Sequence, residues 1–341
     1  MGYRHCQSTS GLPLAKIIKL VAIVLMCLSL WVAPASAKVI RYLDGNSTDV
    51  NVPAGIAFDL GGGGADVDEA IQWMINQARG CTDCSAQVDV VVIRSSGSAG
   101  YNEPILAMNG VDSVETLVIR SRDDANSPDV ADTIRQAEVL FFAGGDQCDY
   151  TRNFKHTATA EAIKSVGAKG GGIGGTSAGA MIQSDFIYNA CSDAVDSEYA
   201  LDDPYEDILF SYDLFNWSLM KGTVIDTHFS DRDRMGRLMT FMARQLRDGI
   251  ADSVLGIGID EGTSLVVNRN GIAQVMGEGA VYFVSADHIP EDCEPQTPLT
   301  FSDYKIWKRE NGEEFDLKNL PSRGYRRASV QDGIVQRGSY S

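Results

Sequence analysis

The segment Gly174-Gly175-Thr176-Ser177-Ala178-Gly179-Ala180 decides how this chain is interpreted, because it joins a short apolar strand to a helix that begins near Ala178. Its G-x-S-x-G spacing in a strand-turn-helix context is typical of a nucleophile elbow, a sharp turn that exposes a strained serine. The N-terminus of the following helix favours developing negative charge. The segment therefore predicts an α/β fold with Ser177 as a nucleophile and the Ala178 N–H as an oxyanion donor.

A serine nucleophile needs a general base, and the histidines outside the first 37 residues are His156, His228 and His288. His228 ends a strand-like run, a position that suits a catalytic loop. A third group must hold the imidazole in the correct tautomer. Asp260 and Glu261 stand at the end of another predicted strand, and Asp226 is nearer to the histidine in sequence. Adjacent strand residues point to opposite sides, so only one of Asp260 and Glu261 can face His228, and the pattern leaves the three acids open.

Short apolar strands alternate with amphipathic helices elsewhere, which predicts a mostly parallel sheet with helices on both faces. Strands are expected at 56–60, 88–93, 117–119 and 139–142 and before Gly174, and helices at 67–75 and 130–137. Four later runs are spaced closely enough to add antiparallel strands at one edge: 254–259, 264–267, 272–276 and 281–284. Asp66 and Glu69 predict a capping box for the first helix. The glycine run 61–64 lacks the spacing of either nucleotide-binding motif and indicates a tight strand-to-helix turn.

Composition places the chain among packed globular proteins, with 44% hydrophobic, 22% charged and 8% aromatic residues over 341 positions. This balance excludes disordered, collagenous and coiled-coil chains. The chain has 46 acidic and 29 basic residues and a formal charge of -17. A surface so acidic repels phosphate backbones, so nucleic acid is not an expected partner, whereas cationic groups on a substrate would be attracted.

Residues 1–37 have the pattern of a cleaved signal peptide. Basic side chains accompany an apolar run over 17–32, and small residues lead to an A-x-A cleavage site after Ala37. A periplasmic or secreted protein without membrane association is therefore expected; an uncleaved N-terminal anchor is the alternative. The remaining chain divides into a catalytic domain over 38–288, an insertion within it at about 192–217, and a C-terminal extension over 289–341.

Five cysteines remain after cleavage: Cys81, Cys84, Cys148, Cys191 and Cys293. In an oxidising compartment they are expected to form structural bridges rather than bind metal. The pair Cys81-x-x-Cys84 has no second pair or histidine nearby, so it is a weak zinc signal. Cys148 and Cys191 flank the strand-helix unit of the nucleophile and are predicted to pair, with Cys293 left free or Cys81 and Cys84 joined locally.

Four segments, in order along the chain, resemble the S51 serine peptidases and most closely their cyanophycinase branch. They are Phe142-Ala143-Gly144-Gly145-Asp146-Gln147, the segment from Gly174 to Ala180, the segment from Asp226-Thr227-His228-Phe229 through Arg237, and Gly256-Ile257-Gly258-Ile259-Asp260-Glu261. The resemblance covers roughly residues 57–284, which is most of the chain. Each motif alone is moderately specific, and their common order strengthens the resemblance.

The resemblance implies a flavodoxin-like α/β fold related to class I glutamine amidotransferases, with a triad of Ser177, His228 and Glu261. The backbone N–H of Gly145 or Asp146 would join that of Ala178 in the oxyanion hole. The implied substrate-binding residues are Gln147, Asp226, Arg232, Arg234 and Arg237. Arginine suits this role because its planar fork matches a carboxylate. The implied reaction is acyl-enzyme hydrolysis of a peptide or isopeptide bond without metal or organic cofactor, as in the release of β-aspartyl-arginine dipeptides from cyanophycin.

Several departures from the family pattern leave the substrate open. Thr227 stands where cyanophycinases usually carry glutamine, the residues after Gln147 differ, and the insertion at 192–217 is long. An α-aspartyl dipeptidase of the same family is one alternative. An esterase of the α/β-hydrolase type would use His288 as base, because its acid precedes its histidine. A non-catalytic binding protein on the same fold would lack an activated serine. The sequence also allows a homodimer.

Overall fold

The computed structural model describes residues 1–3, 39–46, 48, 55–336 and 340. The chain divides into the units Met1–Lys38 and Val39–Ser341. The expected signal peptide lies outside the described residues apart from its first three. Within the described parts of the chain, no helix combines the length and the apolar character that crossing a membrane requires.

The larger sheet of the second unit contains nine strands among the described residues. Their order across the sheet is β1 (Ile40–Gly45), β4 (Val111–Val118), β3 (Val88–Arg94), β5 (Val139–Phe142), β6 (Gly172–Thr176), β2 (Ala57–Gly61), β11 (Thr263–Val267), β12 (Ile272–Gly277) and β15 (Glu314–Asp316). The strands from β4 to β2 are parallel. The pairs at both ends of the sheet are antiparallel. The expected mostly parallel α/β fold with antiparallel edge strands is confirmed.

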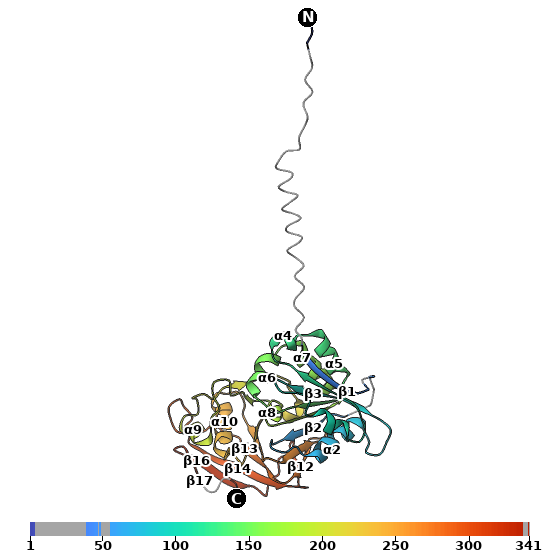
Figure 1. Cartoon of the computed structure of the whole chain (residues 1–341). Helices are drawn as coiled ribbons and strands as arrows, with labels where there is room; N and C mark the ends of the chain where they lie inside the picture. The colour runs from blue at the N-terminus through green and yellow to red at the C-terminus, as the bar shows by residue number, and fades with distance from the viewer. Residues whose placement is uncertain (4–38, 47, 49–54, 337–339, 341) are drawn as a thin grey trace. The chain divides into compact units, whose positions relative to one another are not determined.

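Helices cover both faces of this sheet (Figure 1). On one face, α2 (Asp68–Arg79) packs its Met74 side chain into a cluster with Val90 and Phe141. On the other face, α5 (Pro128–Gln136) and α7 (Ala158–Lys169) share a core with the opposite side chains of the same strands. The shorter helices are α3 (Asn102–Leu106), α4 (Arg122–Ala125), α6 (Gln147–Phe154), α8 (Ala178–Met181), α9 (Ser197–Asp202) and the 3-10 helix η1 (Ser218–Met220). Parallel strands need this double cover because both of their faces are apolar.

The capping box expected at the start of α2 does not form. The helix begins at Asp68, and Val67 occupies the N-cap position without a side-chain hydrogen bond. The Asp66 carboxylate instead accepts hydrogen bonds from the hydroxyls of Tyr101 and Thr176. Hydroxyl groups of two residues distant in sequence therefore bind Asp66, in place of the helix backbone amide that a capping box would use.

A second sheet, which the sequence pattern does not predict, contains six strands among the described residues. Their order is β17 (Ile334–Gln336), β16 (Arg326–Gln331), β14 (Phe301–Glu310), β13 (Ala280–Ala286), β10 (Val254–Ile259) and β9 (Thr223–Thr227). The strands expected at 254–259 and 281–284 pair with each other here instead of at the edge of the first sheet. A further short pair joins β7 (Ile187–Tyr188) to β8 (Phe210–Ser211). Residues beyond 300 contribute strands to both sheets.

One apolar core joins the two sheets. Leu265 and Val275 of the first sheet belong to the same buried cluster as Ile257 and Phe283 of the second. The other face of the second sheet is covered by α10 (Met235–Arg247). Gly256 permits this contact, because a Cβ there would lie 2.6 Å from the sulfur of Met242. The shared core fixes the ends of β2, β6, β9 and β10 relative to one another.

Cys148 and Cys191 form a disulfide, which confirms the expected pairing, and Cys81 and Cys84 are joined locally. Cys293 is a buried free thiol, and burial raises its pKa to about 12. Among the described residues, no group of three or more His, Cys, Asp and Glu side chains has an arrangement that could hold a metal ion.

Candidate active site

Ser177 sits in the sharp turn between β6 and α8. Its φ of 52° and ψ of -123° lie outside the conformations that a non-glycine residue usually adopts. The flanking glycines make the turn possible. A Cβ on Gly179 would lie 2.1 Å from the carbonyl oxygen of Phe142, and one on Gly175 would lie 2.7 Å from the Gly179 carbonyl carbon. This is the strained strand-to-helix geometry of a nucleophile elbow.

The Ser177 hydroxyl meets the imidazole of His228. Its Oγ lies 2.7 Å from His228 Nε2, and His228 Nδ1 lies 2.5 Å from Glu261 Oε1. His228 follows β9 and has a φ of 50°, and Glu261 follows β10. Three loops from neighbouring strand ends thus produce one hydroxyl–imidazole–carboxylate chain. Such a chain can take a proton from the serine and stabilise the resulting imidazolium.

The two other acids that compete for this position are occupied elsewhere. Asp260 Oδ1 accepts a hydrogen bond from Ser230 N at 2.8 Å, and its Oδ2 accepts one from Ala280 N at 3.0 Å. Both oxygens of Asp226 bind the guanidinium of Arg237. Glu261 is therefore the carboxylate that reaches the imidazole. Asp260 instead joins the turn at Ser230 to the start of β13 at Ala280.

Burial lowers the pKa of His228 from its ordinary value of 6.5. The hydrogen bond to Glu261 opposes this effect, while the positive charges of Arg232 and Arg234 add to it. A lowered pKa keeps the imidazole neutral at neutral pH, which is the form that accepts a proton.

The loop from Gly144 to Asp146 lies beside Ser177. A Cβ on Gly144 would approach the Ser177 Cβ to 3.3 Å. The Asp146 side chain caps α6 by accepting a hydrogen bond from Cys148 N at 2.8 Å. Within the described residues, no hydrogen bond engages the backbone amides of Gly145, Asp146 or Ala178. These free amides can serve as donors to an oxyanion at Ser177.

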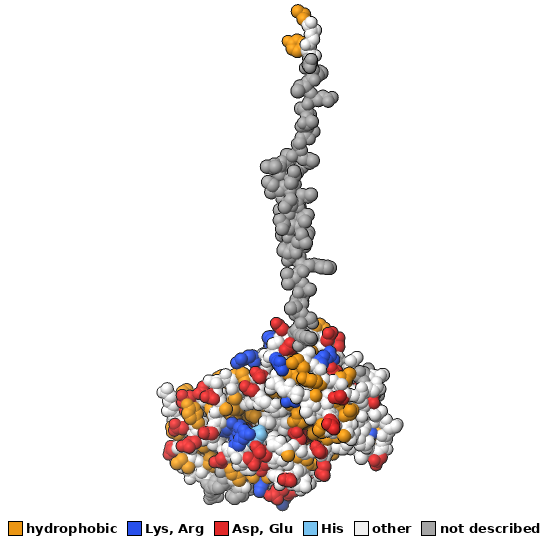
Figure 2. Space-filling model, in the orientation of Figure 1, with side chains coloured by type: hydrophobic (Ala, Val, Ile, Leu, Met, Phe, Trp, Pro, Cys, Tyr) orange, Lys and Arg blue, Asp and Glu red, His pale blue; other side chains and the backbone are white. Residues whose placement is uncertain are grey.

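A pocket of about 390 Å³ opens in front of Ser177. It is lined by Gly145, Asp146 and Gln147 on one side, by parts of residues 188–194 on another, and by parts of residues 227–237. A group of basic side chains with a histidine beside it is visible on this face (Figure 2). Thr227 lines the pocket, and its buried Oγ1 has no hydrogen-bond partner among the described residues.

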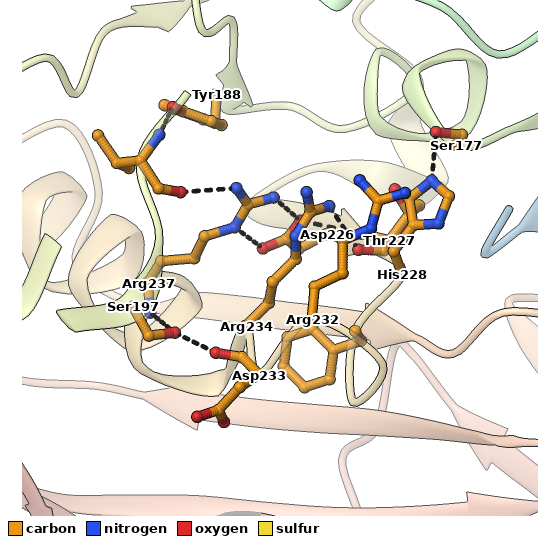
Figure 3. A network of polar contacts seen from close by, with 12 residues as sticks. Ser177, Tyr188, Ser197, Asp226, Thr227, His228, Arg232, Asp233, Arg234 and Arg237 are labelled. Atoms are coloured by element: carbon orange, nitrogen blue, oxygen red, sulfur yellow. Dashed lines mark hydrogen bonds and ion pairs between the residues drawn. The ribbon is translucent and has the colours of Figure 1, made fainter. Parts of the chain in front are cut away.

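The arginines after His228 differ in how completely they are paired (Figure 3). Arg237 is buried, with Nε and Nη2 at 2.7 and 2.6 Å from the oxygens of Asp226 and Nη1 at 2.9 Å from the Val195 carbonyl. Arg234 donates to the Thr227 carbonyl at 2.7 Å and lies 3.5 Å from Asp226 Oδ1. Arg232 is half exposed, with Nη2 3.7 Å from Glu261 Oε1. Arg237 and Asp226 therefore neutralise each other's charge, and both oxygens of Asp226 accept hydrogen bonds from Arg237.

Arg234 is the arginine best arranged to bind an anion from the pocket. No partner of its Nε or Nη2 is found in the described part of the chain, and burial lowers its pKa to about 10. A partly buried guanidinium with unused donors gains from a ligand carboxylate, which satisfies those donors and compensates the charge.

The other histidines lie away from Ser177. The ring of His288 packs edge-on against Phe301, and its Nδ1 is 3.3 Å from the carboxylate of its neighbour Asp287. His156 is exposed, and its carbonyl accepts a hydrogen bond from Arg122. Of these histidines, only His228 lines the pocket.

Two features that hold the loops of the site in place, Asp231 and the glycine run 61–64, were not predicted from the sequence. The Asp231 carboxylate accepts a hydrogen bond from Glu261 N at 2.9 Å, but nothing distinguishes this residue from other acidic loop residues in the sequence. The glycine run 61–64, interpreted above as a tight turn, contacts the loops of Ser177, His228 and Glu261. Four consecutive glycines are more than a tight turn needs, and this was the sequence signal that could have indicated close contacts with the site.

The chain is similar to known peptidases. The family model of peptidase family S51 matches residues 105–275, about half of the chain. Cyanophycinases of Trichormus variabilis and a Nostoc species are each 29% identical over 214 residues, covering 61% of this chain and 66% of their own. The cyanophycinase of Geminocystis herdmanii is 26% identical over 181 residues, 53% of this chain and 61% of its own.

The chain thus spans slightly less than two thirds of the length of the first of these relatives. Among solved structures, a peptidase from an acI-B1 actinobacterium is similar with a TM-score of 0.54. The similarity covers 77% of this chain and 97% of that one at 17% sequence identity. At this identity the likeness supports the fold alone.

Proposed function

The chain belongs to peptidase family S51, and we propose that it is a serine peptidase that hydrolyses aspartyl peptides through Ser177, His228 and Glu261. The observation that carries this proposal is the 2.7 Å contact between Ser177 Oγ and His228 Nε2 at a strained elbow. A strained serine paired with a buried imidazole is the arrangement that makes a hydroxyl nucleophilic. All three residues lie within the span of the family match.

In the proposed reaction, Ser177 Oγ attacks the carbonyl carbon of the scissile bond while His228 Nε2 takes its proton. The carbonyl oxygen becomes an oxyanion that the amides of Ala178 and of Gly145 or Asp146 stabilise. Collapse of this intermediate expels the amine, which receives the proton from His228 and leaves an acyl-serine. A water molecule, deprotonated by the same imidazole, then hydrolyses the ester and restores the hydroxyl. Glu261 stabilises the imidazolium in both halves.

Arg234 is proposed to bind a carboxylate of the substrate, with Arg232 at the pocket mouth and Gln147 opposite. Arg237 and Asp226 are proposed to hold Arg234 and the pocket wall instead of contacting substrate, since they are buried and paired with each other. Both candidate substrates carry a free carboxylate: that of the arginine joined to the aspartate side chain in cyanophycin, and that of the aspartate side chain in an α-aspartyl dipeptide. Cyanophycin is the leading candidate because the similar curated proteins are cyanophycinases. An α-aspartyl dipeptide, which carries a free carboxylate on the aspartate itself, is the second candidate.

We also propose that the protein is exported. The support is the signal-like pattern of residues 1–37 together with the disulfides, which persist in oxidising compartments. Recovery of the protein outside the cytoplasm with an N-terminus at Lys38 would verify this, and a mature chain that retains residue 1 would contradict it.

The function is tested by incubating the purified protein with insoluble cyanophycin, β-aspartyl peptides and α-aspartyl dipeptides, and by identifying the products by mass. Ser177→Ala should abolish hydrolysis and labelling by a fluorophosphonate without unfolding the protein. His228→Ala should do the same, with His288→Ala as the matched control that keeps activity. Loss of activity in His288→Ala alone would favour the esterase mechanism. A wild-type protein that neither reacts with the phosphonate nor cleaves any of these substrates would favour a binding protein.

A further inference from the structure

The glycine run 61–64, which starts at the last residue of β2, accepts hydrogen bonds from the loops of all three proposed triad residues through consecutive carbonyls. The Gly61 oxygen accepts from Ser177 N at 3.0 Å, and the Gly62 oxygen accepts from His228 N at 2.7 Å. The Gly63 oxygen accepts from Gly262 N, the amide next to Glu261, at 2.9 Å. Loops from three different strands are therefore placed relative to one short piece of backbone.

The imidazole of His228 lies directly against the α-carbon of Gly63. A Cβ added there would lie 2.2 Å from His228 Cε1, 2.6 Å from Nε2 and 2.8 Å from Nδ1. Contacts under 3 Å do not occur between such atoms, so the ring would have to move. Nε2 of this ring binds Ser177 and Nδ1 binds Glu261, so a movement of the ring would disturb both hydrogen bonds.

Gly64 has the corresponding contact with the carboxylate. A Cβ on Gly64 would lie 3.0 Å from Glu261 Cβ and 3.2 Å from its Oε2. Gly63 and Gly64 have φ values of 93° and 72°, so backbone conformation also favours glycine at both positions. A tight turn explains the positive φ values, but it does not explain why an added Cβ would overlap the imidazole at Gly63 and lie tightly against Glu261 at Gly64.

We infer that Gly63 and Gly64 are positioning residues: they form the surface against which the His228 imidazole and the Glu261 carboxylate are held in line with Ser177. This inference rests on the proposed triad. Gly63 sets the place of the ring, and Gly64 limits the approach of Glu261. The backbone of Gly63 and Gly64 then holds the His228 ring and the Glu261 carboxylate in place. Because Gly63 lies against the ring, the imidazole cannot move away from Ser177 on that side when it becomes protonated.

The test replaces Gly63 by alanine and compares it with Gly249→Ala. Gly249 has a φ of 68°, and no atom lies within 4 Å of an added Cβ, so it carries the backbone strain without the contact. Gly63→Ala should lower kcat by about 100-fold or more, the effect of a misplacement of about 1 Å, with little change in KM. Gly249→Ala should leave both constants within about twofold of wild type.

A measurement that needs no turnover separates positioning from general damage. The strongly hydrogen-bonded proton between His228 Nδ1 and Glu261 should give a low-field proton resonance in wild type and in Gly249→Ala, and lose or shift it in Gly63→Ala. A folded Gly63→Ala protein with wild-type kcat and an unchanged resonance would overturn the inference. If Gly63→Ala does not fold, Gly64→Ala decides: a lowered kcat with a shifted resonance supports the inference, and wild-type behaviour refutes it.

Failure of the proposed function gives a different result. If Ser177→Ala retains the activity of the wild type, the triad is misassigned whatever the glycine variants do. If wild type depends on Ser177 and the folded Gly63→Ala protein is fully active, the triad stands and the positioning role is wrong.

Discussion

Replacing Arg237 with methionine would remove one partner of a buried charge pair beneath the pocket. The side chains of Asp226 and Arg237 are 0% and 4% exposed, and they form two hydrogen bonds of 2.7 and 2.6 Å. The guanidinium also lies 5.5 Å from the centre of the Tyr188 ring and donates to the Val195 carbonyl. Methionine keeps much of the apolar stem but leaves the carboxylate without its main cation.

The expected cost follows from what remains around Asp226. Removing one member of a buried pair destabilises a protein by about 3–5 kcal/mol, because the other charge stays buried without compensation. Arg234 remains 3.5 Å from Asp226 Oδ1 and partly compensates the charge, so we expect the lower end, about 3 kcal/mol. Asp226→Asn combined with Arg237→Met should recover most of this loss, because it removes the uncompensated charge.

Urea unfolding followed by circular dichroism measures this free energy. Arg135→Met is the matched control: Arg135 pairs with Asp132 at 2.7 Å, but the two side chains are 46% and 70% exposed, so the loss should stay below about 1 kcal/mol. An Arg237→Met protein that loses no more stability than Arg135→Met, or a double variant as unstable as the single one, would contradict this prediction. In kinetic assays the single variant should raise KM, since Val195 and the pocket wall lose their support.

Four further outcomes are expected. Glu261→Gln should lower kcat by up to about 10⁴ with little change in KM, since an amide cannot stabilise the imidazolium; near-normal turnover would mean that another acid orients His228. The logarithm of kcat/KM should fall only as the pH drops through a value below 6.5, because burial lowers the pKa of His228 and the protonated ring is no base. Arg232→Ala should move this acid limb to higher pH by removing a charge that lowers that pKa, and a pH profile with an unmoved limb would contradict this. Cys148→Ser with Cys191→Ser should raise KM more than it lowers kcat, measured on a soluble dipeptide, because the disulfide joins the helix after Gln147 to the pocket wall; equal constants would exclude that role.

The elbow could be predicted from local sequence because its determinants are local. Glycines at 175 and 179 leave room for the turn, and the apolar run before them and the small residues after them define the strand and helix. The position of His228 after a strand-like run made it the candidate base, and the family resemblance selected Glu261 from the three candidate acids. The alternation of strand residues could not choose between Asp260 and Glu261. That choice depends on the amide of Ser230, in the turn after His228, and on the amide of Ala280, at the start of β13.

The second sheet could not be predicted from periodicity, because an apolar run identifies a strand without identifying its neighbour. The run at 254–259 fits an edge strand of the first sheet equally well. Its place beside β9 and β13 depends on α10 and Phe229, whose side chains lie against Gly256 and Gly258. The failed capping box has a similar origin, since Asp66 binds hydroxyls from Tyr101 and Thr176 that are distant in sequence.

The positive φ angles of Ser177 and His228 lower the stability of the fold at two positions that the proposed mechanism requires. Their φ values of 52° and 50° each cost a non-glycine residue about 1–2 kcal/mol. Glycine would relieve that strain at either position while removing the hydroxyl or the imidazole. Selection for thermal stability alone would therefore favour glycine at both positions and yield a more stable protein without the hydroxyl and the imidazole that the proposed reaction needs. Directed evolution of this scaffold needs an activity screen at every round, or its gains in heat resistance will come first from the two proposed catalytic residues.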